Sequence, residues 1–206
     1  KGISPILAAV LVVAFTTVVT MCMVDGITKK SVAAMLGTII GVVFSGAFAL
    51  IFGQVTSITG YNVSDIENLV YVGEMTDIKI GELLFAGILI ASLGAVMDVG
   101  MSIASTLNEL KEQNPQMMLK ELFQSGMNVG RDMMGTMTNT LILAFTGGSI
   151  NTLVFIFAYN YEYQQVINMY SVGIEIMQGL SSSLGVIMAV PVTSWIAAFL
   201  YSKNQK

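Results

Sequence analysis

The sequence has few charged residues and lacks the side chain on which much enzyme chemistry depends. Charged residues make up 11% of the 206 residues, against about a quarter in an ordinary soluble domain. There is no histidine, which excludes His-based zinc sites, Ser-His-Asp triads and imidazole proton relays. The single cysteine, Cys22, excludes a disulfide within the chain. We therefore expect no catalytic centre, no metal site and no cofactor.

Basic residues are also too sparse for a nucleic-acid partner. The formal net charge is −4, and no run of Lys or Arg is present to neutralise phosphates. Hydrophobic residues, by contrast, make up 54% of the chain. A chain of this composition cannot place its apolar surface inside and its charges outside as a globule does, so the lipid bilayer is its expected partner.

Long apolar runs indicate an all-α, polytopic membrane protein. A helix needs about twenty mostly apolar residues to cross the hydrocarbon core. We read residues 1–206 as a single transmembrane domain with spans at residues 3–24, 32–58, 81–107, 133–157 and 180–201. Interfacial helices are predicted around residues 64–72, 115–129 and 164–179, where polar and apolar side chains mix.

The distribution of basic residues predicts the orientation of these spans. Cytoplasmic loops carry an excess of Lys and Arg. Seven of the nine basic residues fall on one side of the predicted bilayer: Lys29, Lys30, Lys111, Lys120, Arg131, Lys203 and Lys206. We therefore expect the N-terminus outside and the C-terminus in the cytoplasm.

Small residues recur every four positions in the second span. They are Ala33, Gly37, Gly41, Ser45, Ala49 and Gly53. This spacing lines small side chains along one helical face and lets another helix approach closely. It predicts a packing seam.

A second small stripe, in the third span, is also polar. It contains Gly87, Ala91, Gly94, Asp98, Ser102, Ser105 and Glu109, all on one helical face. An aspartate such as Asp98, about 13 Å from the inner end by helix rise, costs roughly 2.5 to 3.5 kcal/mol in lipid. Two interpretations stay open: a hydrogen-bonded acid that holds two helices together, or a residue on an ion or proton pathway.

The segment GRDMMGTMTNTLILAFTGGS, residues 130–149, offers partners for that acid. By the predicted orientation, three polar residues of the fourth span lie within about one turn of the depth of Asp98. The candidate intramembrane site is therefore Asp98, Ser102, Ser105, Thr136, Asn139 and Thr140. Arg131 and Asp132 come just before the predicted span, so we place them at the cytoplasmic mouth of this site.

Two further features interrupt the apolar pattern. Gly147 and Gly148 lie inside the fourth span, where paired glycines weaken a helix, and they predict a helix break. Glu175 precedes the hydroxyl-rich phrase GLSSSL, as Asp98 precedes MSIASTL, and is a possible second acidic site.

Several long phrases resemble the YibE/YibF-like family of bacterial membrane proteins. They include DGITKKSVAAMLGT from Asp25, LLFAGILIASLGAVMDVGMSIAS from Leu83 and GRDMMGTMTNTLILAFTGGS from Gly130. The resemblance covers nearly the whole chain. It implies a bacterial plasma membrane, and since family members are longer or split into two polypeptides, it implies that this chain is the membrane portion.

The leading functional hypothesis is a permease or transporter component for a small solute or ion, with its polar site around Asp98. The alternative is a non-transporting structural or interaction subunit, held to a second copy or to a companion membrane chain by small-residue faces. A third reading, an intramembrane aspartyl protease, needs two facing acids, and only Asp98 and Asp132 could supply them. We expect no enzymatic activity.

Overall fold

The computed structural model describes residues 4–61, 66–76 and 78–202, and every regular element in them is a helix. The long helices are α1 (Pro5–Asp25), α2 (Lys29–Val55), α4 (Leu83–Gln113), α5 (Leu119–Gly148) and α8 (Tyr170–Ser202). The short ones are α3 (Ile66–Thr76), the 3-10 helix η1 (Ile80–Glu82), α6 (Ile150–Ala158) and α7 (Tyr163–Ile167). The all-α prediction is confirmed.

Four helices of the described chain are long and apolar enough to cross a membrane: α1, α2, η1 continued by α4, and α8. α5 and α6 pass the same test as a pair that is bent by 54° and make a fifth candidate. The protein is therefore a multi-pass membrane protein, as its composition predicts.

Two helices run further than the sequence predicts. Residues 115–129 and 164–179, predicted as separate interfacial helices, form for the most part the first turns of α5 and α8. Within a helix the backbone N–H and C=O groups bond to each other, in water as in lipid. A change from polar to apolar side chains along the sequence therefore does not require the helix to end. The 33 residues of α8 measure about 50 Å, so α8 tilts or projects beyond a hydrocarbon core about 30 Å thick.

Local sequence signals explain where several helices begin. Pro5 occupies the first turn of α1, where its missing N–H costs nothing. The Thr28 hydroxyl accepts the Ser31 N–H at 3.1 Å and caps α2. The predicted surface helix around residues 64–72 corresponds to α3, with residues 64 and 65 outside the described ranges.

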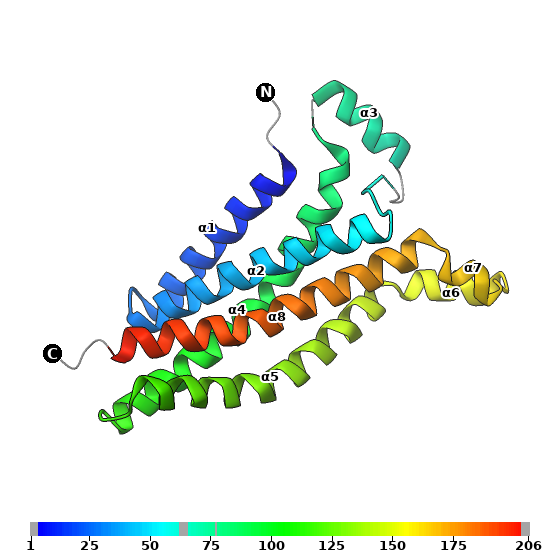
Figure 1. Ribbon diagram of the computed structural model, residues 1–206. Helices are drawn as coiled ribbons and strands as arrows, with labels where there is room; N and C mark the ends of the chain where they lie inside the picture. The colour runs from blue at the N-terminus through cyan, green and yellow to red at the C-terminus, as the bar shows by residue number, and fades with distance from the viewer. Residues whose placement is uncertain (1–3, 62–65, 77, 203–206) are drawn as a thin grey trace.

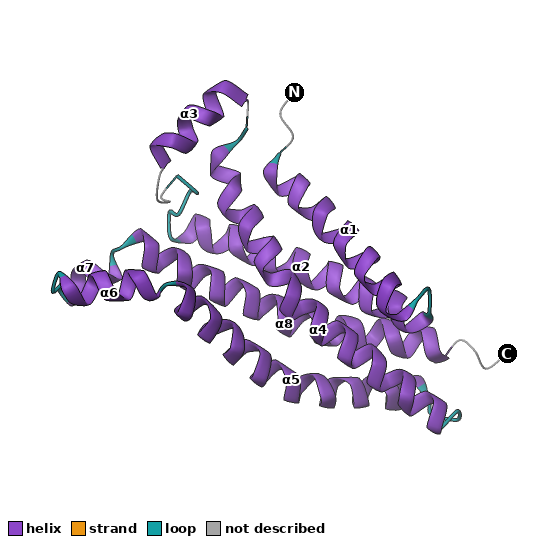
Figure 2. Cartoon of the chain, turned by 180° about the vertical axis from the view of Figure 1, so that it is seen from behind, coloured by secondary structure: helices purple, strands orange, loops and turns teal. Residues whose placement is uncertain are grey.

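The helices form a bundle with two distinct ends (Figure 1). One end carries the α1–α2 turn, the α4–α5 turn and the last turn of α8. The other carries α3, α6 and α7. Figure 2 shows α4 and α5 diverging from their shared turn, so the two helices pack together chiefly near that end.

α8 lies at the centre of the bundle, packed against α2, α4 and α5. All six small residues of the predicted seam on α2 are buried. At Gly41 a Cβ atom would lie 2.8 Å from the Ala189 Cβ and 3.2 Å from the Gly185 carbonyl oxygen, so the two backbones touch. The predicted seam is confirmed: it packs against α8 and, at Gly41 and Gly53, against Val96 and Phe85 of α4 in the same chain.

Candidate functional site

α5 and α6 meet at a bend of 54°. α5 ends at Gly148 and α6 begins at Ile150, at the glycine pair where the sequence predicts a break. Ser149 joins them: its N–H and its hydroxyl both donate to the Phe145 carbonyl at 3.0 Å. The Ser149 carbonyl accepts the Leu153 N–H at 3.1 Å and starts the new helix.

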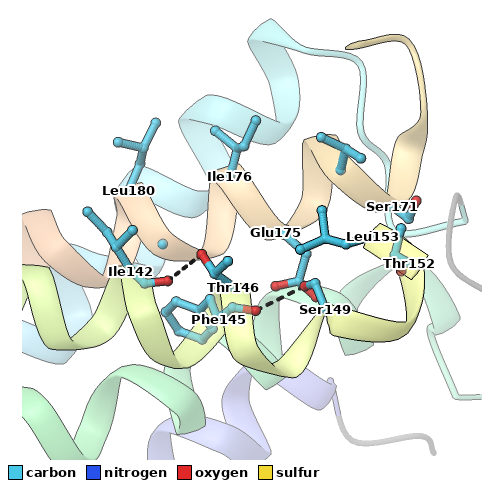
Figure 3. Close-up of a pocket in the computed structure, with 12 residues that line it drawn as sticks. Ile142, Phe145, Thr146, Ser149, Thr152, Leu153, Ser171, Glu175, Ile176 and Leu180 are labelled. Atoms are coloured by element: carbon cyan, nitrogen blue, oxygen red, sulfur yellow. Dashed lines mark hydrogen bonds between the residues drawn. The ribbon is translucent and has the colours of Figure 1, made fainter. Parts of the chain in front are cut away.

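A pocket of about 330 Å³ opens between this bend and the first half of α8 (Figure 3). Glu175 extends from α8 toward Ser149 at the bend. The hydroxyl-bearing residues in the lining are Thr146, Ser149, Thr152 and Ser171. The other lining residues are apolar: Ile142, Phe145, Leu153, Val172, Ile176, Gly179 and Leu180. Thus two features that the sequence shows separately, Glu175 and the glycine pair, meet at one pocket.

The lining of this pocket is mostly apolar, with a few oxygen-bearing side chains in it. Glu175 is its single ionisable residue, and no Lys or Arg lines it. Where a helix ends, its last carbonyls lose their helical partners, and where the next begins, its first N–H groups do. In membrane transporters such breaks bind ions and polar groups at membrane depth. One carboxylate and four hydroxyl-bearing residues are thus the polar groups of an otherwise apolar lining.

The structure does not enclose the polar site that the sequence predicts around Asp98. Asp98, Thr136, Asn139 and Thr140 are exposed on the outside of the single chain, and Ser102 and Ser105 are half-buried. The Thr136 and Thr140 hydroxyls donate to the carbonyls one turn earlier, at 3.4 and 2.9 Å. No hydrogen bond or ion pair given for the described residues joins α4 to α5 at these positions.

The position of Arg131 and Asp132 also differs from the prediction. Because α5 begins at Leu119, Arg131 lies about 18 Å along the helix by its rise and not at its mouth. Its neighbour Gly130 contacts Val190 in the middle part of α8. Both charged side chains are exposed.

Shared neighbours place these charges at the level of Asp98. At Gly41, near the middle of α2, a Cβ atom would lie 2.7 Å from Val96 of α4 and 2.8 Å from Ala189 of α8. Asp98 is two residues beyond Val96, about 3 Å by helix rise. Asp98, Arg131 and Asp132 therefore all lie near mid-height in the bundle. The two acids needed for an aspartyl protease share this level, and no hydrogen bond joins them in the part of the chain that the structure describes.

Sequence reasoning did not predict that several hydroxyls of α2 and α8, Ser45 of the seam among them, are buried without a partner among the residues that the structure describes. In the described chain these buried oxygens have no hydrogen-bond partner: Thr38, Ser45, Ser181, Ser182, Ser183, Thr193 and Ser194. The spacing of small residues could have predicted these buried hydroxyls, since serine and threonine occur together with glycine and alanine on closely packed helix faces. The pocket-lining Thr152 and Ser171 were also missed, because nothing local marks them.

Comparison with known proteins agrees with the resemblance seen in the sequence. The family model described as YibE/F-like protein matches residues 1–203. No curated protein and no solved structure matches the chain. Because the matched region covers nearly the whole sequence, the chain belongs to the YibE/F-like protein family.

Proposed function

We propose that this protein is a component of a permease for a small solute or ion. The observation that carries the proposal is the pocket at the α5–α6 bend, where a broken helix and Glu175 come together. Irregular backbone at membrane depth occurs where it lines a cavity or is buried in protein. Here it borders a cavity large enough for a small solute.

The charge of the lining favours a cation or a solute with a positively charged group. Glu175 has no basic residue beside it in the lining, and four hydroxyl-bearing residues surround it. Small monovalent cations take oxygen ligands such as these, and transporters hold them at unwound helix ends.

We further propose that the pocket faces outward across a bacterial plasma membrane. Lys29, Lys30, Lys111 and Lys120 belong to the end of the bundle that carries the α1–α2 and α4–α5 turns. The excess of basic residues assigns that end to the cytoplasm. The N-terminus is then outside and the C-terminus inside. The proposal contains no chemical step and no cofactor.

In this proposal the residues around Asp98 form a second polar position deeper in the bundle. Asp98 is exposed on α4, as are Thr136 and Asn139 on α5. A single chain leaves them open, so a pathway through this level requires another chain to close it.

Flux measurements on purified protein in phosphatidylethanolamine–phosphatidylglycerol liposomes test the proposal. Trapped pyranine reports H⁺ movement, and ion-selective dyes report Na⁺ and K⁺. We expect one of these ions to move at least about ten times faster than in empty liposomes, the size of effect that about 1.4 kcal/mol produces. Glu175→Gln should remove most of that flux.

Glu74→Gln is the matched control. Glu74 is an exposed acid on α3, at the same end of the bundle, and it is not in the pocket lining. Its variant should keep the wild-type rate. Flux no faster than in empty liposomes for all three ions would contradict transport of these cations, and equal loss in both variants would contradict a role for Glu175.

The alternative is a non-transporting interaction subunit, and one observation favours it. Three charged side chains stand exposed at mid-height of the bundle, which suits a surface covered by another chain. The small-residue seam on α2 no longer supports this alternative, since α8 covers it. A wild-type protein that moves no ion yet purifies as a stable assembly would favour it.

A further inference from the structure

The outer face of α4 is small, polar and uncovered. Gly87, Ala91, Gly94 and Asp98 lie on one side of the helix, and all four are exposed. Nothing lies within 4 Å of a Cβ atom built at Gly87 or at Gly94. Helices that approach closely in a membrane use faces of this kind, and among the described residues no helix lies against Gly87 or Gly94.

Two opposite charges stand at this level without a partner. Asp98 of α4 and Arg131 of α5 are both exposed near mid-height in the bundle, as their neighbours Val96 and Gly130 show. Neither forms an ion pair in the described part of the chain. α4 and α5 diverge away from their shared turn (Figure 2). Charges at such depth normally face protein or water and pair with one another.

We propose that a second copy of this chain covers the outer face of α4 and brings its Arg131 against Asp98. The argument is charge complementarity. In the described chain the lysines lie toward the helix ends, and Arg131 is the one cation at the height of Asp98. A second copy in the same orientation supplies that cation at the matching depth, because both copies share one membrane plane. The open positions at Gly87 and Gly94 let the neighbouring helix come close enough.

This association does not depend on transport. A pairing through Asp98 and Arg131 is compatible with a permease and with a structural subunit. It gives the exposed polar residues of α4 a protein surface in place of lipid in either case.

Cross-linking between differently tagged copies tests the contact. In a Cys22→Ala background, one copy carries Asp98→Cys and the other carries Arg131→Cys, and a short bis-methanethiosulfonate reagent is added to membranes. We expect a product that carries both tags. Val12→Cys replaces Asp98→Cys as the control, because Val12 is 51% exposed and lies on another helix, α1. Equal cross-linking from Val12 and Asp98 would overturn the proposal.

A second variant tests the face without touching a charge. Gly94→Leu adds a side chain where the single chain has open space, so the fold should be unaffected. We expect at least a tenfold weaker association, measured by energy transfer between labelled copies in liposomes, with Val12→Leu as the matched control. Wild-type protein that is monomeric in liposomes, or unchanged association in Gly94→Leu, would contradict the proposal.

Exchanging the two charges tests whether Asp98 and Arg131 contact each other specifically or whether the copies associate without this contact. Asp98→Arg and Arg131→Asp should each weaken association, and the double variant should recover part of it. Recovery is the expected result because the exchanged charges still attract each other. Failure to recover in a double variant that folds would show that the two residues do not meet.

Discussion

Two helices of this protein carry nearly the same stripe of small residues, and the stripes have opposite surroundings. On α2 the stripe is fully buried, and Gly41 lies against the backbone of α8. On α4 the first four residues of the stripe are exposed, and Gly94 has open space in front of it. The periodic pattern marks a face that a helix can approach. It does not say whether that helix belongs to the same chain.

The composition of the two stripes does carry a difference. The α2 stripe contains glycine, alanine and serine, which cost little in lipid or in protein. The α4 stripe adds Asp98, which costs roughly 2.5 to 3.5 kcal/mol if it faces lipid. A small stripe with a charge is therefore the one for which an external partner should be sought.

The largest effect should come from filling the buried stripe. Gly41→Leu forces a side chain into space that Val96, Ala189 and the Gly185 carbonyl occupy, within 3.2 Å of the Cβ position. We expect a loss of about 3 kcal/mol, which lowers the Tm in detergent by about 6–12 °C.

The identical change on the other stripe provides the comparison. Gly94→Leu should leave the detergent Tm of the single chain within about 2 °C of the wild-type value, since it meets no atom. A similar loss of Tm in Gly41→Leu and Gly94→Leu would show that the stripes on α2 and α4 are equally packed, and would contradict the difference described above.

A smaller effect is expected where α8 is bound to α4. The buried Tyr201 hydroxyl donates to the Ala104 carbonyl at 3.0 Å. Tyr201→Phe removes this hydrogen bond and should cost about 1 kcal/mol, or about 2–4 °C in Tm. Tyr163→Phe, on an exposed residue at the opposite end of the bundle, is the control and should change nothing.

The smallest effect should come from the unpartnered hydroxyls beside the seam. Thr193→Val replaces a buried hydroxyl that has no hydrogen-bond partner in the described chain. We expect unchanged stability or a gain of about 1 kcal/mol, because a desolvated hydroxyl is replaced by a methyl of the same shape.

Thr17→Val is the matched control for this substitution. The buried Thr17 hydroxyl donates to the Val13 carbonyl at 2.7 Å, so its loss should lower the Tm slightly. A larger loss from Thr193→Val than from Thr17→Val would show that the Thr193 hydroxyl is hydrogen-bonded in the folded protein.

Much of the fold could be predicted because hydropathy and helical spacing are local properties. The apolar runs located the spans, and the four-residue spacing on α2 identified its buried face. The boundary predicted between residues 129 and 133 failed because side-chain polarity reports the surroundings of each turn, whereas helix continuity depends on the backbone.

The candidate site was harder to predict because it depends on how helices rotate and cross. Asp98 and Thr136 were expected to face each other, but helix spacing fixes a residue's face without fixing which neighbour that face meets. Gly147, Gly148 and Glu175 were each noticed in the sequence. Their meeting at one pocket follows from the path of α8 alongside the bend, which no local pattern encodes.

The central position of α8 bears on how the protein is made. α8 follows every other span of the described chain, and yet it provides the contact surface for α2 and for much of α5. During insertion α2 and α5 must therefore reside in the bilayer before their main partner exists. Small, weakly polar residues cost little free energy when they face lipid. The stripe on α2 therefore suits a helix that is inserted before α8 is present to pack against it.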